Sequence, residues 1–272
     1  MSPLPVVGEG AGWEALDHHL IQVRGCRICP AVEPPPVAAR PEAWPRLMLV
    51  GQAPGPKEVV EQRPFAYTAG TRLFSWFARF GVPEEEFRRR AYICAVARCF
   101  PGRAPQGGDR VPSPQEIANC APYLEKELRL IRPATVLPVG QLAIKVFLPE
   151  PAPLHERVGS RFQVSRGDVT FEVIPLPHPS GRSTWLVKPE NQQRLERALA
   201  LVRGSAGWRE TFGLESGWTS EELDRALKVE PMTGAQIVAS GLLGGWEDEG
   251  ITDSAAWVEE QRRKRRDREP GS

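Results

Sequence analysis

Apolar residues recur along the chain in short runs that end at glycine or proline. Four such runs predict β-strands, over residues 46–50, 91–98, 134–139 and 169–176. The runs are apolar almost throughout, which is typical of strands buried on both faces of a sheet. A loop follows each run, and we expect the unusual residues of these loops to meet at one edge of the sheet.

Between these strands the apolar positions are spaced by three and four residues, which predicts amphipathic helices. The helical patterns cover residues 69–80, 113–132, 141–148 and 189–203. Ser113 and Glu116 form a capping box that begins the second helix, and Pro133 ends it. The alternation of strands and helices indicates an α/β fold, a three-layer α/β/α sandwich around a central four-stranded, mostly parallel sheet.

The two ends of the chain differ from this central part. Residues 1–45 are rich in proline and contain one short helical pattern near residues 13–23. Residues 46–204 form the predicted α/β/α domain. Residues 205–272 contain four of the eight tryptophans and two helical patterns, residues 220–228 and 253–268. We therefore expect a small helical C-terminal appendage of unknown function.

Composition excludes several classes of protein. Hydrophobic residues make up 41% and charged residues 25%, as in globular proteins. No apolar run approaches the roughly 18 residues of a membrane span, and we see no secretory signal, so we expect a cytoplasmic protein. Residues 1–204 carry 26 Lys and Arg against 20 Asp and Glu, whereas residues 205–272 carry 9 against 14. The basic body hints at a polyanionic partner.

Five cysteines favour metal or redox chemistry over a disulfide framework in such a chain. Cys26 and Cys29 form a C-x-x-C pair in a proline-rich stretch, Cys99 ends a predicted strand, and Cys120 lies on the following helix. Four thiolates suit a structural zinc ion or a [4Fe–4S] cluster. Cys94 lies inside a predicted strand, and we interpret it as a core residue.

Two loops at the predicted strand ends carry candidate chemistry. Residues 51–55 (GQAPG) lack the ending of a P-loop and the spacing of a dinucleotide fingerprint, so we expect no nucleotide cofactor. They form either a plain β-turn or a turn whose exposed amides hold a water, a phosphate or a base edge. His178 lies between two prolines that restrict its backbone. A neutral imidazole there can donate a hydrogen bond to developing negative charge; the alternative is a solvated loop histidine.

Other charged residues have simpler interpretations. His18 and His19 lie on the N-terminal helical pattern, and we expect both to be solvated rather than to bind a metal. The acidic residues 84–86 and basic residues 88–90 predict a solvated helix face. The basic run 262–266 is either a solvated helix end or a nucleic-acid contact.

In their order and spacing, these motifs resemble the uracil-DNA glycosylase superfamily, specifically its iron–sulfur (family 4-like) branch. The resemblance covers about residues 26–203. It rests on the C-x-x-C pair, Val50–Gly55, Arg63-Pro64-Phe65 with Ala69-Gly70, Arg98-Cys99, Cys120 and His178-Pro179-Ser180. It implies a monofunctional N-glycosyl hydrolase of base excision repair, which flips uracil out of DNA and cleaves its bond to deoxyribose.

The resemblance also implies roles for individual residues. His178 would donate to uracil O2, and Phe65 would stack on the flipped base. The turn of Gly51, Gln52, Ala53, Pro54 and Gly55 would hold water and the sugar. In the loop that follows His178, Ser180 and Arg182 would contact DNA. Cys26, Cys29, Cys99 and Cys120 match the ligands of a structural [4Fe–4S] cluster, with zinc as the alternative.

Two departures from the family pattern concern the water. Ala53 stands where the best-known branch carries its water-activating aspartate, and Gln52 stands where iron–sulfur members commonly have glutamate. Gln52 can still position a water through hydrogen bonds. Glu58 and Glu61 follow closely and are candidates to replace the missing carboxylate.

Two further departures concern the base and the cluster. Ala95 aligns with an asparagine that reads the uracil edge in many relatives, so we expect weaker discrimination against cytosine or action on a related damaged base. The interval between Cys99 and Cys120 is lengthened by an insert around residues 107–110.

Competing hypotheses follow from these departures. The alternative to a DNA repair glycosylase is a weakly active or inactive DNA- or partner-binding protein on a degenerate glycosylase fold. The missing carboxylate and asparagine favour it, whereas His178 and Phe65 oppose it. A third hypothesis is a zinc-stapled protein whose tail carries the function. A monomer without membrane contacts, associated with the nucleoid, is the simplest expectation.

Overall fold

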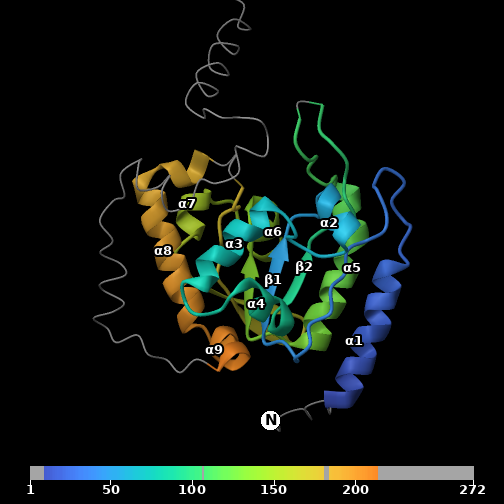
Figure 1. The fold of residues 1–272 in the computed structure, drawn as a ribbon, viewed down its shortest axis with the longest axis horizontal. Helices are drawn as coiled ribbons and strands as arrows, with labels where there is room; N and C mark the ends of the chain where they lie inside the picture. Colours follow the sequence, from blue (N-terminus) through green and yellow to red (C-terminus); the bar gives the residue numbers. More distant parts are fainter. Residues whose placement is uncertain (1–8, 106, 181–183, 214–272) are drawn as a thin grey trace, which may run out of the picture. The chain divides into compact units, whose positions relative to one another are not determined.

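The computed structural model describes residues 9–105, 107–180 and 184–213, and within these ranges the chain forms an α/β/α sandwich (Figure 1). Two helical patterns predicted in the tail, residues 220–228 and 253–268, lie outside the described residues, as does the basic run 262–266. No helix of the described part is long and apolar enough to cross a membrane.

The central sheet has five strands in the order β2-β1-β3-β5-β4. Their bounds are Leu47–Gly51 (β1), Tyr92–Ala95 (β2), Thr135–Pro138 (β3), Phe162–Arg166 (β4) and Val169–Val173 (β5). β1 pairs in parallel with β2 and β3, and β3 pairs in parallel with β5, whereas β4 is antiparallel to β5. The mostly parallel sheet is confirmed, but it has five strands rather than the four expected.

The hydrophobic pattern did not predict the fifth strand, β4, because this strand is only half buried. Its side chains alternate between partly buried and exposed, as expected for an edge strand with one solvated face. A tight turn at Gly167 and Asp168, with Gly167 at a φ of 59°, joins β4 to β5. Such a hairpin is a short antiparallel extension of the parallel sheet.

Helices cover both faces of the sheet. Their bounds are Glu9–Arg24 (α1), Pro56–Glu61 (α2), Thr68–Ala78 (α3), Glu84–Arg90 (α4), Pro114–Ile131 (α5), Gln141–Phe147 (α6), Leu154–Arg157 (α7), Pro189–Gly204 (α8) and Ala206–Phe212 (α9), with a 3-10 turn η1 at Thr184–Val187. The predicted capping box of α5 is confirmed, since the Ser113 hydroxyl accepts from the Glu116 amide and the Glu116 carboxylate accepts from the Ser113 amide.

Two cores hold the layers together. On one face, Met48 and Val50 of β1 pack with buried residues of α1, α5 and α6. On the other face, an aromatic cluster joins α3, α4 and α9, with Phe77 stacked on Phe87 at 4.7 Å and Trp208 5.5 Å from Phe77. Figure 1 shows α1 and α5 together on one side of the strands, away from α8 and α9.

The helix α9 lies in the part of the sequence that we assigned to the C-terminal appendage. It packs against β1 and β3, and the amide of Gly207 donates to the Thr135 hydroxyl at 3.0 Å. Trp208 is fully buried. The sandwich therefore includes at least residues up to 213 among those that the structure describes.

The expectation for the N-terminal histidines is wrong for one of them. His18 is exposed, but His19 is fully buried, and its Nε2 lies 3.2 Å from Oε1 of Glu127 on α5. Neighbouring positions on a helix face different ways, and the turn that carries His19 faces α5. Cys94 is buried in β2, which confirms its interpretation as a core residue.

Candidate functional site

The carboxyl ends of β1 and β2 and the loop after β5 enclose a small cavity of about 110 Å³. Parallel strands place their carboxyl ends at one edge, where ligands of such sheets bind. The cavity is lined by Val37, Gly51, Gln52, Ala53, Pro54, Gly55, Glu58, Pro64, Phe65, Ala69, Cys94, Ala95, Asp109 and His178. The predicted turn residues, Phe65, Ala95 and His178 therefore meet in one place.

The turn of residues 51–55 is fixed by hydrogen bonds to the chain that continues β2. The carbonyl of Gly51 accepts from the Val96 amide at 2.9 Å, and that of Gln52 accepts from the Ala97 amide at 3.0 Å. The amide of Gly55 donates to the Glu58 carboxylate. The sheet thus holds the turn in place, and the residues of the turn line the cavity.

Phe65 has an unusual backbone conformation for a bulky residue. Its φ is 54°, in the left-handed region that side chains disfavour. The ring is 8% exposed and lies so close to Gly51 that a Cβ atom on that glycine would be 2.8 Å from the ring Cζ. Strained residues of this kind persist only where their surroundings hold them.

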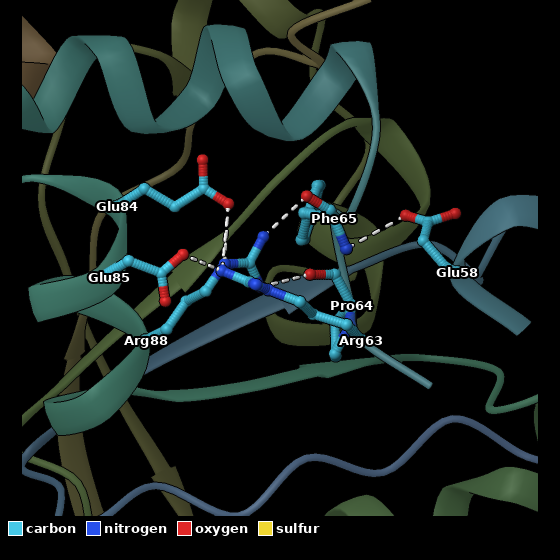
Figure 2. A network of polar contacts seen from close by, with 7 residues as sticks. All are labelled: Glu58, Arg63, Pro64, Phe65, Glu84, Glu85 and Arg88. Atoms are coloured by element: carbon cyan, nitrogen blue, oxygen red, sulfur yellow. Dashed lines mark hydrogen bonds and ion pairs between the residues drawn. The ribbon is translucent and has the colours of Figure 1, made fainter. Parts of the chain in front are cut away.

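Figure 2 shows the polar network that holds Phe65. Arg88 of α4 donates to the carbonyl of Pro64 at 2.6 Å and to the carbonyl of Phe65 at 2.7 Å. Its Nε donates to Glu84 at 2.8 Å, and Glu84 also lies near Arg63. One guanidinium therefore clamps both carbonyls that flank the strained residue.

Glu58 clamps the same segment from the other side. One carboxylate oxygen accepts from the Gly55 amide and the other accepts from the Phe65 amide at 3.0 Å. Burial raises the pKa of Glu58, the two amide hydrogen bonds oppose this rise, and the nearby Asp109 adds to it. Glu58 thus ties the turn to Phe65 from the floor of the cavity.

His178 packs on Gly140, whose φ of 85° and missing side chain allow the close approach. The amide of Ser180 donates to Nδ1 of His178 at 3.2 Å, so in the neutral ring the proton is on Nε2. Burial lowers the pKa of His178, which favours this neutral form. The buried Arg72 holds the loop by donating to the carbonyl of Pro179 at 2.9 Å.

A wider cleft of about 770 Å³ shares His178 and Gln52 with the small cavity. It is bordered by His155, Trp185, Lys188 and Arg194, among other residues of α7, η1 and α8. Ser180 lies beside the small cavity through its bond to His178, whereas Arg182 lies outside the described residues. The small cavity therefore opens beside a cleft that carries basic side chains.

The four predicted metal ligands surround a second cavity of about 200 Å³. Cys26, Cys29, Cys99 and Cys120 all line it. Burial, followed by the proximity of the other three sulfurs, raises the pKa of Cys99 to about 12. Within the described residues, no group of three or more His, Cys, Asp or Glu side chains is placed to hold a metal ion directly.

Arg98 is a lining residue of this cavity with buried N–H groups that have no acceptor. The side chain is 2% exposed, lines the cavity, and pairs through Nη2 with Glu127 at 2.5 Å. Burial alone would lower the pKa of Arg98, but Glu127 outweighs burial and raises it. Its Nε and Nη1 atoms have no hydrogen-bond partner. Four thiols and buried cationic donors at one cavity fit an anionic group held by thiolates.

Several residues of these sites were missed by the sequence analysis or were left without a role. Arg88 was assigned to a solvated helix face, yet its side chain is 9% exposed and clamps Phe65. His19 and Glu127 form a buried pair behind Arg98. Asp109 was noted only as part of an insert, and it lines the small cavity. No periodicity marks such residues, because their roles depend on contacts between distant segments.

Comparison with known proteins gives one consistent answer. The family model of the uracil DNA glycosylase superfamily matches residues 41–203. The chain is similar to the type-4 uracil-DNA glycosylase of Archaeoglobus fulgidus, at 27% identity over 191 residues, which covers 67% of this chain and 89% of that protein. For the proteins of the same name from Pyrobaculum aerophilum and Sulfurisphaera tokodaii, identity is 28% over 193 residues and 30% over 188. These matches cover 69% and 67% of this chain and 91% and 80% of those proteins.

Proposed function

This chain belongs to the uracil DNA glycosylase superfamily, and from that membership we propose that it is a monofunctional DNA repair glycosylase. It hydrolyses the bond between uracil, or a related damaged base, and deoxyribose. The observation that carries the proposal is the small cavity in which a strained aromatic ring, a glycine turn and a neutral histidine meet. The base enters this cavity after flipping out of the DNA, since the bond is inaccessible in the stacked duplex.

His178 stabilises the leaving base. As the glycosidic bond breaks, its electron pair moves onto the base, and negative charge develops on the base oxygen. The Nε2 proton of His178 is free to donate to that oxygen, because Nδ1 accepts from the Ser180 amide. A neutral donor with a lowered pKa needs no protonation before each turnover.

Phe65 and the turn position the substrate. The Phe65 ring offers a rigid stacking surface because Arg88 and Glu58 hold its backbone. Gln52 lies in both cavities and positions a water on the sugar side. No lysine lines the small cavity in the described part of the chain, so a Schiff base is not expected and the product is an abasic site.

The wider cleft provides the path for the DNA strand. Lys188, Arg194 and His155 border it and are suited to phosphate contacts. Such contacts position the backbone so that one nucleotide reaches the small cavity. They also make binding depend on salt, since each neutralised phosphate releases counterions.

The cysteine cavity fits a [4Fe–4S] cluster held by Cys26, Cys29, Cys99 and Cys120. The fit rests on the four sulfurs and on Arg98, a lining residue whose buried Nε and Nη1 atoms have no hydrogen-bond partner. A cluster bound by these cysteines would link the N-terminal segment to α5 and to the chain that follows β2.

The proposal is tested with the purified full chain and oligonucleotides that carry one uracil, single-stranded or in a U·G pair. Alkali cleavage reports abasic sites. We expect cleavage by the wild type and a loss of about 100-fold in His178→Ala, equivalent to roughly 3 kcal/mol. Uracil left intact by a folded, DNA-binding wild type would overturn the enzyme assignment in favour of a binding protein.

The absorption spectrum of the same sample tests the cluster. A [4Fe–4S] protein prepared without oxygen is brown and absorbs broadly at about 400 nm, whereas zinc thiolates are colourless. We expect the brown form, with absorbance lost in Cys99→Ser. A colourless protein that contains stoichiometric zinc would assign the cavity to zinc instead.

A further inference from the structure

We propose that Asp109, carried by the insert between Cys99 and Cys120, supplies the carboxylate that the glycine turn lacks and acts as the catalytic base. The inference rests on the proposed function, because it names a residue for that hydrolysis. Neither Gln52 nor Ala53 can accept a proton from the attacking water. Asp109 is a carboxylate of the same small cavity that contains His178 and Phe65.

The described residues on the two sides of the insert pair with each other and bring Asp109 back toward the sheet. Arg103 and Asp109 form an antiparallel bridge. The Ala104 amide donates to the Gly108 carbonyl at 2.9 Å, and the Arg110 amide donates to the Gly102 carbonyl at 2.8 Å. These bonds fix the backbone on both sides of Asp109.

The residue after Asp109 anchors the hairpin to the domain. Arg110 donates to both carboxylate oxygens of Glu116 on α5, at 2.9 and 2.8 Å. It also donates to the carbonyl of Pro101 at 2.8 Å. A bidentate pair of this kind fixes orientation as well as distance. The position of Asp109 is therefore tied to α5, a rigid element of the sandwich.

The two oxygens of Asp109 have different surroundings. Oδ1 accepts from the Arg103 guanidinium at 3.1 Å, which fixes the orientation of the carboxylate. Oδ2 faces the turn, 3.3 Å from the position that a Cβ atom would take at Gly55. The side chain is 43% exposed, so water reaches it. Asp109 thus presents one anchored oxygen and one oxygen directed at the turn.

Glu58 is the other carboxylate of the cavity, and it is less suited to this role. Both of its oxygens already accept backbone amide protons, from Gly55 and Phe65. Proton uptake by Glu58 would weaken the clamp on the aromatic ring during catalysis. We therefore assign Glu58 to positioning and Asp109 to the reaction itself.

The proposed step balances as a hydrolysis. The C1′–N bond breaks, and its electron pair leaves with the base, which accepts a hydrogen bond from His178. The oxygen of water forms a bond to C1′, and one water proton moves to Oδ2 of Asp109. That proton then passes through solvent to the released base anion, and Asp109 returns to its ionised state.

Single-turnover cleavage of uracil-containing DNA by full-length variants tests the role of Asp109. Asp109→Asn keeps the shape but removes the proton acceptor, and we expect a loss of at least about 100-fold. Asp109→Glu is expected to regain part of that rate. Affinity for DNA with a non-cleavable 2′-fluoro-deoxyuridine should not weaken in either variant. Asp168→Asn is the matched control, since Asp168 is also half exposed and pairs with an arginine, Arg132, at 2.7 Å.

The outcomes separate this inference from the proposed function. Wild-type protein that releases no base overturns the proposed function. Wild-type cleavage with an equally fast Asp109→Asn variant overturns the base assignment alone. Arg103→Ala serves as a second comparison, because it removes the ion pair but leaves the carboxylate. A loss as large in Arg103→Ala as in Asp109→Asn would show that the pair shapes the insert, and it would also overturn the base assignment.

Discussion

Gly51 must lack a side chain because the Phe65 ring occupies the space beside it. In Gly51→Ala the new methyl would lie 2.8 Å from Cζ and 3.1 Å from Cε2 of the ring, where ordinary contact begins at 3.4 Å. The ring cannot simply withdraw, since Arg88 and Glu58 hold the Phe65 backbone from both sides. We therefore expect Gly51→Ala to strain this contact and displace the ring.

Overpacking a well-filled core costs about 1–3 kcal/mol, and we expect Gly51→Ala to lower the free energy of unfolding by this amount. For a domain of this size, such a loss corresponds to a decrease in Tm of roughly 2–12 °C. Activity should fall further than stability, because about 1 Å of misplacement at a reacting group can cost about 100-fold in rate. The protein is expected to remain folded and to bind DNA.

A double-mutant cycle isolates the contact. Phe65→Leu removes the ring atoms that Gly51→Ala meets, so the alanine substitution should cost less in that background. We expect a coupling free energy of about 1–2 kcal/mol from urea unfolding, within the usual range for residues in contact. If the effects of the two substitutions on the free energy of unfolding add to within about 0.5 kcal/mol, the two sites are independent and the reasoning is refuted.

Three further predictions concern the arginine clamps and the histidine. Arg98→Met removes the arginine partner of the buried Glu127 carboxylate, which keeps only its contact with His19 on the other oxygen, so urea unfolding should show a loss of about 3–5 kcal/mol in the free energy of unfolding, and bound iron, counted by colorimetric assay, should fall. Burial lowers the pKa of His178 below its ordinary value of 6.5, so the unfolded chain takes up this proton more readily than the folded protein does. The contribution of His178 to the free energy of unfolding is therefore complete above pH 6.5 and declines as the pH falls below that value. The free energy of unfolding of His178→Asn, measured between about pH 7 and pH 5, should lack this decline. Arg88→Lys keeps the charge but not the planar fork, so uracil release at saturating DNA should slow while Tm changes little, and an unchanged rate would contradict the clamp on Phe65.

The sequence predicts the sheet edge and much of the small cavity, because both depend on local signals. Short apolar runs mark β1, β2, β3 and β5, and parallel strands bring their carboxyl ends together. The turn at residues 51–55 and His178 follow two of these runs, so their convergence could be expected before any coordinates. The resemblance to a family added Phe65 to this picture, and it favoured a [4Fe–4S] cluster over zinc at the four cysteines.

The residues that support the site could not be predicted in the same way. The left-handed conformation of Phe65 is set by Arg88, which lies 23 positions later on a helix that looks solvated. His19 resembles its exposed neighbour in sequence and is distinguished only by its contact with Glu127, 108 positions away. The place of Asp109 in the small cavity depends on the path of the insert between Cys99 and Cys120, which the sequence does not reveal. Non-local contacts of this kind leave no periodic trace along the chain.

The contact between α1 and α5 also constrains the order in which this protein can be completed at the ribosome. His19 emerges first, and its partner Glu127 follows 108 residues later. At about 5–20 residues per second, α1 waits for roughly 5–20 s before α5 has been synthesised. During that interval the apolar face of α1, with Leu16, Leu20 and Val23, lacks α5, the helix with which α1 shares this core. The apolar face of α1 is therefore incompletely buried until α5 has been synthesised.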